Sequence, residues 1–276
     1  MTVGSLIDAI IRKSNTVVET DTCDKLISGD LNTEITGIVT TFMATVDVIR
    51  QAIACGANFI ITHEPTYFTG KDRLDWLQDD PVYQQKKALI EENGICIWRF
   101  HDHIHAAADG DGIYRGMLRE LGWENYLQPV EQKSSTILMN DLCYQIPPIT
   151  LKDLAVFLKE KLQVQSVRII GQEDLVCQRV GFLIGGGSLG LGHEEMPMQQ
   201  MQKQNFDVLI CGEITEWTSC AYVRDASQMG MPKGMIVVGH NRTEEAGMKY
   251  LDEWLKPLTG EIPIRFIEAG DPFQYV

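Results

Sequence analysis

Short apolar runs alternate along this chain with segments in which apolar residues return every three or four positions. The short runs are typical of buried strands, and the periodic segments are typical of amphipathic helices. Regular alternation of the two indicates βαβ units, whose strands form a largely parallel sheet covered by helices. The pattern therefore predicts an α/β fold with parallel or mixed sheets.

The apolar runs predict strands at residues 35–43, 58–62, 95–100, 134–144, 166–170, 180–184, 207–211 and 235–239. The periodic segments predict helices at residues 3–13, 46–55, 82–93, 113–121, 151–161, 194–204, 217–228 and 243–255. The stretch 123–133 contains Pro129 and has no clear period, which makes it the predicted seam between two α/β lobes. We expect a first lobe over residues 1–127 and a second over 128–276, whose part from about 207 to 276 returns to the cleft between the lobes.

Metal-capable side chains follow four of the predicted strands. They are His63 and Glu64, then His101, Asp102, His103 and His105, then Glu213, and finally His240 and Glu244. In open parallel sheets, ligands bind in the crevice formed by the loops at the carboxyl ends of the strands. We therefore expect these side chains to gather in one crevice.

Histidines are concentrated in residues 101–105. If a strand continued through this stretch, His101, His103 and His105 would share one face, and their imidazoles could converge on a cation. The alternative is a polar strand end with solvated histidines. Because three imidazoles so close together are costly to bury without partners, we favour the cation site.

The two other groups each allow two interpretations. His63 and Glu64 could point to different sides of a strand end and serve two ions of a close pair, or they could form a surface turn stiffened by Pro65. His240 and Glu244 are four residues apart where a helix is expected to begin, so both could bind one centre. Glu244 could equally stabilise the N-terminus of that helix through its dipole.

Taken together, the candidate ligands offer nitrogen and oxygen but no thiolate, which suits Zn, Fe, Mn or Ni. Two such ions that share a carboxylate lower the pKa of a bridging water and hold an electrophile, as in dinuclear hydrolysis. The sequence thus indicates two divalent metal ions per subunit.

The stretch Gly185 to Gly190 follows a predicted strand and has the G-x-G-x-x-G spacing of a dinucleotide loop. A dinucleotide site also needs an acidic residue at the end of the next strand, but Asp207 stands at the start of that strand and Cys211 near its end. The loop could still hold an anion. We favour a packing role, in which the glycines let a helix approach a strand closely.

The net charge and the cysteines indicate which partners and which cellular location to expect. A formal net charge of −14 repels phosphate backbones, and the chain has no cluster of Lys and Arg, so we expect no nucleic-acid partner. The seven cysteines form no CxxC pair, which favours reduced thiols, a cytoplasmic location and a role as small core residues. No apolar run approaches the roughly 18 residues of a membrane span, and the opening residues have no export signal, so neither membrane insertion nor export is expected.

The sequence resembles the Nif-three-like family (Ngg-one-interacting factor three), dinuclear metal-binding proteins also labelled type-two GTP cyclohydrolase one homologues. The resemblance runs from the first predicted helix to the C-terminus. It rests on residues 36–68, 101–105, 207–221 and 237–244 and on the closing GDPFQYV. It implies two α/β lobes with the metal ions in the cleft between them, and a ring-shaped homohexamer.

The resemblance also implies a set of metal ligands: His63, Glu64, His105, His240 and Glu244. Two of them depart from the family pattern, because Glu64 stands where the family usually has a second His and His105 stands where it has an Asp. The two departures exchange an imidazole for a carboxylate and a carboxylate for an imidazole, so the total ligand charge is conserved. This reciprocity indicates that the site is retained.

The resulting hypothesis is a metal-dependent hydrolase of a small metabolite, such as a phosphorylated compound or a cyclic amide. His101, Asp102, His103 and Glu213 would move protons or hold the ligands in place. The second hypothesis is a non-enzymatic metal-binding regulator or scaffold that acts through its oligomer. An amidohydrolase barrel built on His101 and His103 is excluded, because too few βα units follow residue 101.

Overall fold

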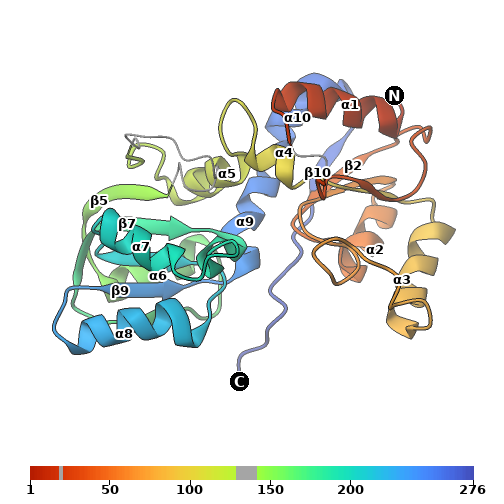
Figure 1. Cartoon of the computed structure of the whole chain (residues 1–276). Coiled ribbons are helices and arrows are strands. Elements are labelled where there is room, and N and C mark those ends of the chain that lie inside the picture. Colours follow the sequence, from red (N-terminus) through yellow and green to blue (C-terminus); the bar gives the residue numbers. More distant parts are fainter. Residues whose placement is uncertain (19–20, 129–141) are drawn as a thin grey trace. The chain divides into compact units, whose positions relative to one another are not determined.

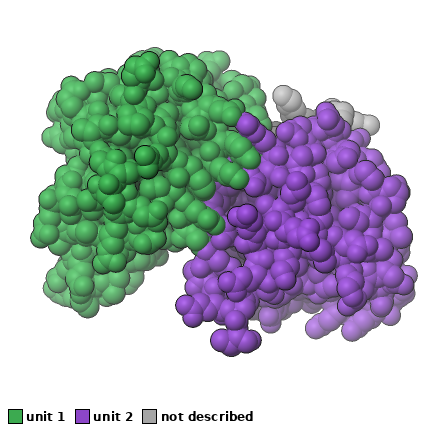
Figure 2. All heavy atoms as spheres, turned by 180° about the vertical axis from the view of Figure 1, so that it is seen from behind, with its two compact units in different colours: residues 1–116, 247–270 green, residues 117–246, 271–276 purple. Residues whose placement is uncertain are grey.

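The computed structural model describes residues 1–18, 21–128 and 142–276, which divide into two compact units. Unit 1 comprises residues 1–116 and 247–270, and unit 2 comprises residues 117–246 and 271–276 (Figure 2). The division falls within two helices, α5 (Gly112–Leu121) and α9 (His240–Lys249). The boundary predicted after residue 127 lies inside unit 2, and residues 247–270 return to unit 1.

Unit 1 is built on a mixed sheet that, in the part of the chain described, has five strands in the order β1-β4-β3-β2-β10 (Figure 1). Neighbours from β4 to β10 are parallel, and β1 runs antiparallel to β4 at the edge. The three central strands are buried at every residue, as expected of strands covered on both faces. The strands are β1 (Leu26–Ser28), β2 (Ile38–Thr41), β3 (Phe59–Thr62), β4 (Cys96–Arg99) and β10 (Ile264–Phe266).

Helices cover this sheet and start at side-chain caps. Thr2, Thr45 and Asp80 accept hydrogen bonds from backbone N–H groups in the first turns of α1, α2 and α3. Residues of α2 and α3 form the core of one face together with Val39 and Ile60 of the sheet, whereas α1 packs against α10. The helices are α1 (Val3–Ser14), α2 (Val46–Ala54), α3 (Pro81–Glu92), α4 (Asp102–His105) and α10 (Leu251–Thr259).

Unit 2 repeats the plan with a second mixed sheet, in the order β5-β7-β8-β9-β6 over the residues described. The inner pairs are parallel and the two edge pairs antiparallel. The strands are β5 (Cys143–Thr150), β6 (Arg168–Ile170), β7 (Val176–Leu183), β8 (Val208–Cys211) and β9 (Gly234–Val237). The helical segments are α6 (Leu151–Lys161), η2 (Gly185–Leu189), α7 (Met196–Lys203), η3 (Glu216–Cys220) and α8 (Ala221–Gln228).

These two sheets confirm the α/β fold with parallel and mixed sheets. The sequence pattern missed β1 and β10, which have three residues each and are too short to show a period. The predicted strand at 134–144 overlaps β5 only at its last residues, and its part before residue 142 lies outside the described residues.

At the first residue of the predicted seam at 123–133, Trp123 is buried in unit 2 and stacks on Phe157 with ring centroids 5.9 Å apart. Residues 129–133 of that stretch lie outside the described residues. No helix in the described ranges is both long and apolar enough to cross a bilayer.

Candidate metal centre

The carboxyl ends of two parallel strands carry the first group of predicted ligands. His63 follows the last residue of β3 directly, and β3 pairs in register with β4 so that Thr62 lies opposite Arg99. The chain that leaves β4 reaches His101 two residues later. Parallel register therefore places His63 and His101 side by side at one edge of the sheet.

Residues 101–105 do not continue the strand, which corrects the prediction of one strand face shared by His101, His103 and His105. The strand ends at Arg99, and Asp102–His105 form the short helix α4. In a helical turn, residues four apart lie on one face, so His101 and His105 face the same way and His103 does not. His103 points instead to Asp24, with Nδ1 2.7 Å from the Asp24 Oδ2.

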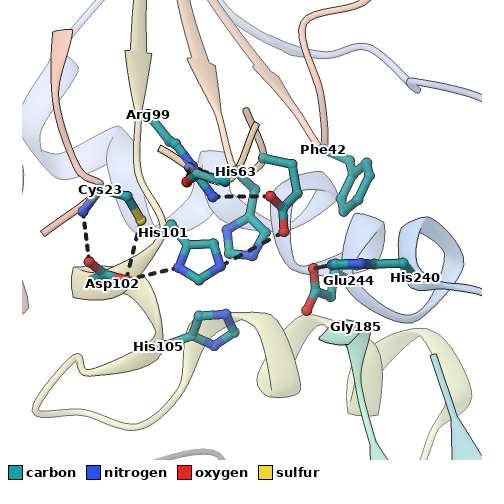
Figure 3. A network of polar contacts seen from close by, with 12 residues as sticks. Cys23, Phe42, His63, Arg99, His101, Asp102, His105, Gly185, His240 and Glu244 are labelled. Carbon is teal, nitrogen blue, oxygen red and sulfur yellow. Dashed lines mark hydrogen bonds and ion pairs between the residues drawn. The ribbon is translucent and has the colours of Figure 1, made fainter. Parts of the chain in front are cut away.

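Three imidazoles of unit 1 come together as a result (Figure 3). The ring of His63 stacks on that of His101 with centroids 4.5 Å apart, and His105 meets both rings edge-on at 5.0 Å. One ligand atom from each of the three lies within 4.8 Å of the other two. His63 is fully buried and His105 is nearly so. We call His63, His101 and His105 the histidine trio.

Each ring of the histidine trio is anchored at Nδ1. The partner is the carbonyl oxygen of Phe100 for His63 (3.2 Å), Asp102 for His101 (3.0 Å) and Asp111 for His105 (2.8 Å). A carbonyl or carboxylate oxygen can only accept, so Nδ1 carries the hydrogen and Nε2 keeps the lone pair. This is the arrangement that metal-binding histidines show in proteins, where an outer acceptor fixes the tautomer.

Two of the supporting carboxylates were missed from sequence. Asp24 is buried and accepts hydrogen bonds from the backbone N–H groups of His101, Asp102 and His103, at 2.6, 2.7 and 2.9 Å. It therefore caps α4 from a distant part of the chain. Asp111 bonds His105 with Oδ2 while Oδ1 caps α5 by accepting from Ile113 N and Tyr114 N. Only the Asp111 cap has a sequence signal, an Asp just before a periodic segment.

Glu64 is held by a buried cation that the sequence did not single out. Arg99 is 3% exposed, and its Nη2 lies 3.0 Å from Glu64 Oε2. The same guanidinium donates from Nε to the carbonyl oxygen of His63 (3.0 Å) and from Nη1 to that of Gly70 (2.5 Å). The second oxygen of Glu64 is 3.8 Å from His101 Nε2, which is too long for a hydrogen bond.

The pKa shifts in this network favour a neutral ring of His101 and ionised carboxylates of Asp102 and Asp24. Burial, with the neighbouring His63, lowers the pKa of His101, so its neutral form is favoured. The hydrogen bond from His101 lowers the pKa of Asp102 in spite of burial. Burial opposes ionisation of Asp24, but the hydrogen bonds from His103 and from the backbone of α4 outweigh it and lower its pKa. Neutral imidazole is the form that binds metal ions.

Cys23 approaches the same network without the properties of a nucleophile. Its Sγ is 3.4 Å from Asp102 Oδ1, and burial raises the pKa of its thiol to about 12. The thiolate, which is the reactive form, is therefore suppressed. All seven cysteines are free, and five are buried: Cys96, Cys143, Cys177, Cys211 and Cys220. These five match the predicted role of small core residues.

The second group of predicted ligands lies in unit 2 at the start of α9. His240 and Glu244 share one face of the helix, with Nε2 2.9 Å from Glu244 Oε2. The other ring nitrogen, Nδ1, is 3.1 Å from Glu213 Oε1, so Glu213 anchors His240 as the carboxylates of unit 1 anchor theirs. Glu244 is 3% exposed and Glu213 has about half of its side chain exposed. We call His240 and Glu244 the helix pair.

The glycine loop packs against the helix pair (Figure 3). Gly185 has a left-handed φ of 49°, donates its N–H to Thr243 Oγ1 (2.9 Å) and accepts from Glu213 N (2.9 Å). A Cβ at this position would lie 1.9 Å from Glu244 Oε1 and 2.8 Å from His240 Nε2. Only glycine therefore fits here, which supports the close-packing interpretation of this loop.

Within each unit, the donors present fit a divalent ion of the borderline class. Unit 1 offers imidazole nitrogens with the tautomer already set, and unit 2 offers one imidazole and one buried carboxylate. The structure thus brings together His63, Glu64, His101 and His105 in unit 1 and Glu213, His240 and Glu244 in unit 2, and it sets His103 apart. Convergence of the two groups on one pair of ions stays a prediction.

Comparisons with known proteins find relatives in sequence and in structure. A GTP cyclohydrolase 1 type 2 homolog from Clostridium acetobutylicum is 28% identical over 229 residues, which are 79% of this chain and 76% of the relative. A relative of the same name from Haemophilus influenzae is 28% identical over 246 residues, 87% of either chain. A solved structure, a Bacillus cereus protein related to NIF3, covers 100% of this chain and 99% of its own with a TM-score of 0.75. At 17% identity it shows the common fold.

The family resemblance drawn from the sequence is confirmed by a direct match. The model of Duf34/NIF3 (NGG1p interacting factor 3) matches residues 1–272. This range includes both sheets, the histidine trio and the helix pair. The chain therefore belongs to the Duf34/NIF3 family.

Proposed function

We propose that this protein binds two divalent metal ions per subunit and hydrolyses a small metabolite with them. The observation that carries the proposal is the histidine trio, whose three Nδ1 atoms are all anchored by acceptors. Buried imidazoles in this arrangement have little structural use, since apolar residues fill a core at lower cost. They are suited to present Nε2 to a cation.

The proposed ligands are His63, Glu64 and His105 from unit 1 and His240 and Glu244 from unit 2, with Glu244 shared by the two ions. When bound, such ions lower the pKa of a coordinated water and polarise an electrophilic substrate atom. The neighbouring carboxylates have positioning roles. Asp102 orients His101, and Glu213 orients His240.

Proton transfer falls to residues at the rim of the two groups. His101 is partly exposed and bonded to Asp102, whose ionised form stabilises a proton taken up by the ring. Glu213 is half exposed beside His240 and is in a position to exchange protons with solvent. His103 is directed to Asp24, so it acts on the structure of α4 and does not face the trio.

The substrate is proposed as a small, phosphorylated or cyclic-amide compound. The names of the two curated relatives describe those proteins as GTP cyclohydrolase 1 type 2 homologs. A homohexamer and a cytoplasmic location stay predictions.

Metal analysis and one conservative substitution test the proposal. Protein purified without chelators should contain about two equivalents of metal and should turn over a member of an ester, amide and nucleotide panel. Glu244→Gln should abolish turnover and leave the oligomer intact, because it removes one charge without changing shape. Glu194→Gln, an exposed position in the same unit, is the control.

Two outcomes count against the enzyme. Loaded protein that is inert toward the whole panel contradicts hydrolysis. Collapse of the oligomer on Glu244→Gln, measured by analytical ultracentrifugation, favours the scaffold in which the metal is structural.

A further inference from the structure

Glu64 and His101 have surroundings that do not match the roles expected of them from the sequence. Sequence reasoning made Glu64 a metal ligand and gave His101 a proton-transfer role. In the structure, Glu64 forms an ion pair with Arg99, whereas His101 stacks on His63 and meets His105 edge-on. The carboxylate of Glu64 therefore already has a charged partner, whereas the ring of His101 lies among other imidazoles.

The ion pair of Glu64 is expensive to break. Arg99 is buried, and its other donors are committed to the carbonyl oxygens of His63 and Gly70. If Glu64 turned Oε2 to a metal ion, the guanidinium would be left buried without its counter-charge, and an ion bound at Oε1 would be repelled by the nearby guanidinium charge. The two charges also stabilise each other, since the side chain of Glu64 is only 14% exposed. Arg99 thus competes with a metal ion for this carboxylate.

His101, by contrast, has the properties of a ligand. Its Nδ1 is occupied by Asp102, which directs the lone pair to Nε2. Its ring and those of His63 and His105 are mutual neighbours, and a ligand atom of each is within 4.8 Å of the others. All three residues belong to unit 1, so their arrangement is fixed within one compact unit.

We infer that unit 1 holds its metal ion with the three imidazoles of His63, His101 and His105, while Glu64 remains paired with Arg99. The inference rests on the proposed function and changes it at one centre: His101 replaces Glu64 as a ligand, so proton transfer falls to Glu213. Three neutral nitrogen ligands select Zn, Co, Ni or Cu over Mg, Mn and Ca, which prefer oxygen. They also leave a coordination position open, as in catalytic zinc sites.

Imidazole NMR of the wild-type chain tests this directly. The full-length protein, stripped of metal and labelled with ¹⁵N in histidine, is titrated with Zn²⁺. The Nε2 resonances of His63, His101 and His105 should shift together, and those of His103 and His193 should not. If the His101 Nε2 resonance keeps its metal-free position when His63 and His105 have shifted, the inference is overturned.

Two substitutions give an independent measurement by Co²⁺ titration, followed by visible absorption. His101→Asn should weaken Co²⁺ binding at the unit 1 centre by at least about 10-fold. Glu64→Gln should change it less than about 3-fold, and His193→Asn, at an exposed histidine of unit 2, is the control for His101→Asn. The reverse order, with Glu64→Gln severe and His101→Asn silent, overturns the inference. Circular dichroism of each variant establishes that it is folded.

Failure of the proposed function gives a different result. In a chain carrying His240→Asn and Glu244→Gln, bound metal should fall from two equivalents to one, and the remaining ion should still depend on His101. If His63→Asn and His105→Asn leave metal binding unchanged, unit 1 has no metal centre and the proposed function itself fails. If these two variants lose metal while His101→Asn does not, only the three-imidazole centre is wrong.

Discussion

The histidine trio of unit 1 and the helix pair of unit 2 are held in place by different means. The trio depends on acidic and basic side chains, since Asp24, Asp102 and Asp111 fix the turn and the rings and Arg99 holds Glu64. The helix pair depends on close backbone approach, because Gly185 lies directly against His240 and Glu244. Charged side chains thus hold the histidine trio in place, whereas the helix pair requires a neighbouring residue that has no side chain.

The largest effect is expected where the charge network of unit 1 is broken. Arg99→Met leaves the carboxylate of Glu64 and the carbonyl oxygens of His63 and Gly70 without their donor. The free energy of unfolding should fall by about 3–5 kcal/mol, measured by denaturant titration. Arg115→Met is the control, because its ion pair with Asp109 is on the surface and should contribute less than about 1 kcal/mol. An equal fall in the free energy of unfolding in both variants would show that the buried ion pair contributes no more than the surface pair.

The corresponding break in unit 2 is steric. Gly185→Ala places a Cβ 1.9 Å from Glu244 Oε1 at a left-handed φ, so the helix pair must shift. We expect a loss of about 2–4 kcal/mol in the free energy of unfolding, from overpacking and backbone strain together. Gly192→Ala separates the two causes, since Gly192 has a left-handed φ of 92° but no neighbour within 4 Å of the added Cβ. It should cost only about 1 kcal/mol. A similar loss in both variants would remove the steric argument.

The pH dependence of stability tests a further buried charge of unit 1, the amine of Lys86. Lys86 is 6% exposed, donates to Thr66 O at 2.7 Å, and burial lowers the pKa of its amine to about 8, against the opposing charge of Asp72. Above pH 8 the folded chain releases this proton, whereas the unfolded chain keeps it until about pH 10.5. The unfolded state then binds more protons, so stability should rise by about 2 kcal/mol between pH 8 and pH 10.

The tyrosine beside Lys86 does not titrate in this pH range. Burial raises the pKa of Tyr67, so this nearby phenol stays neutral throughout. Lys86→Met should abolish the rise, and Lys87→Met, at the half-exposed neighbouring lysine, should leave it unchanged. A rise that survives in Lys86→Met assigns it to another group.

The smallest change in stability, but an informative one, is expected for Asp111→Asn. The side-chain oxygen can still cap α5, so the free energy of unfolding should fall by only about 1 kcal/mol. An amide nitrogen facing His105 Nδ1 cannot accept its hydrogen, so the ring should move that hydrogen to Nε2. The ¹⁵N resonances of His105 report the tautomer, and Asp109→Asn is the exposed control. An unchanged tautomer would show that Asp111 does not set it.

The residues that could be predicted from sequence are those whose signal is local. His63, His101, His105, His240 and Glu244 follow strand ends, and strand ends are visible in the apolar pattern. The i,i+4 spacing of His240 and Glu244 gave the correct helical face. The same spacing of His101 and His105 was overlooked, because the alternating HxHxH pattern also matches a strand.

The supporting residues could not be predicted, because their partners are far along the chain. Asp24 bonds residues of α4 that lie about 80 positions away, and nothing around Asp24 marks it. In the sequence, Arg99 is only one polar residue in an apolar run. Its three acceptors belong to the loop after β3. The Arg99 pairings follow from the parallel register of β3 and β4, and the Asp24 contact follows from the antiparallel pairing of β1 with β4; composition and period specify neither.

The capping of α4 by Asp24 bears on when the trio forms during folding. A helix of four residues has no stability of its own, so α4 is ordered by tertiary contacts, among them the long-range contact with Asp24. Closing so long a loop costs entropy that is recovered only after β1 has paired with β4. The imidazoles are thus assembled late in folding and released early in unfolding. Loss of the Asp24 cap should then accelerate unfolding and leave the folding rate nearly unchanged.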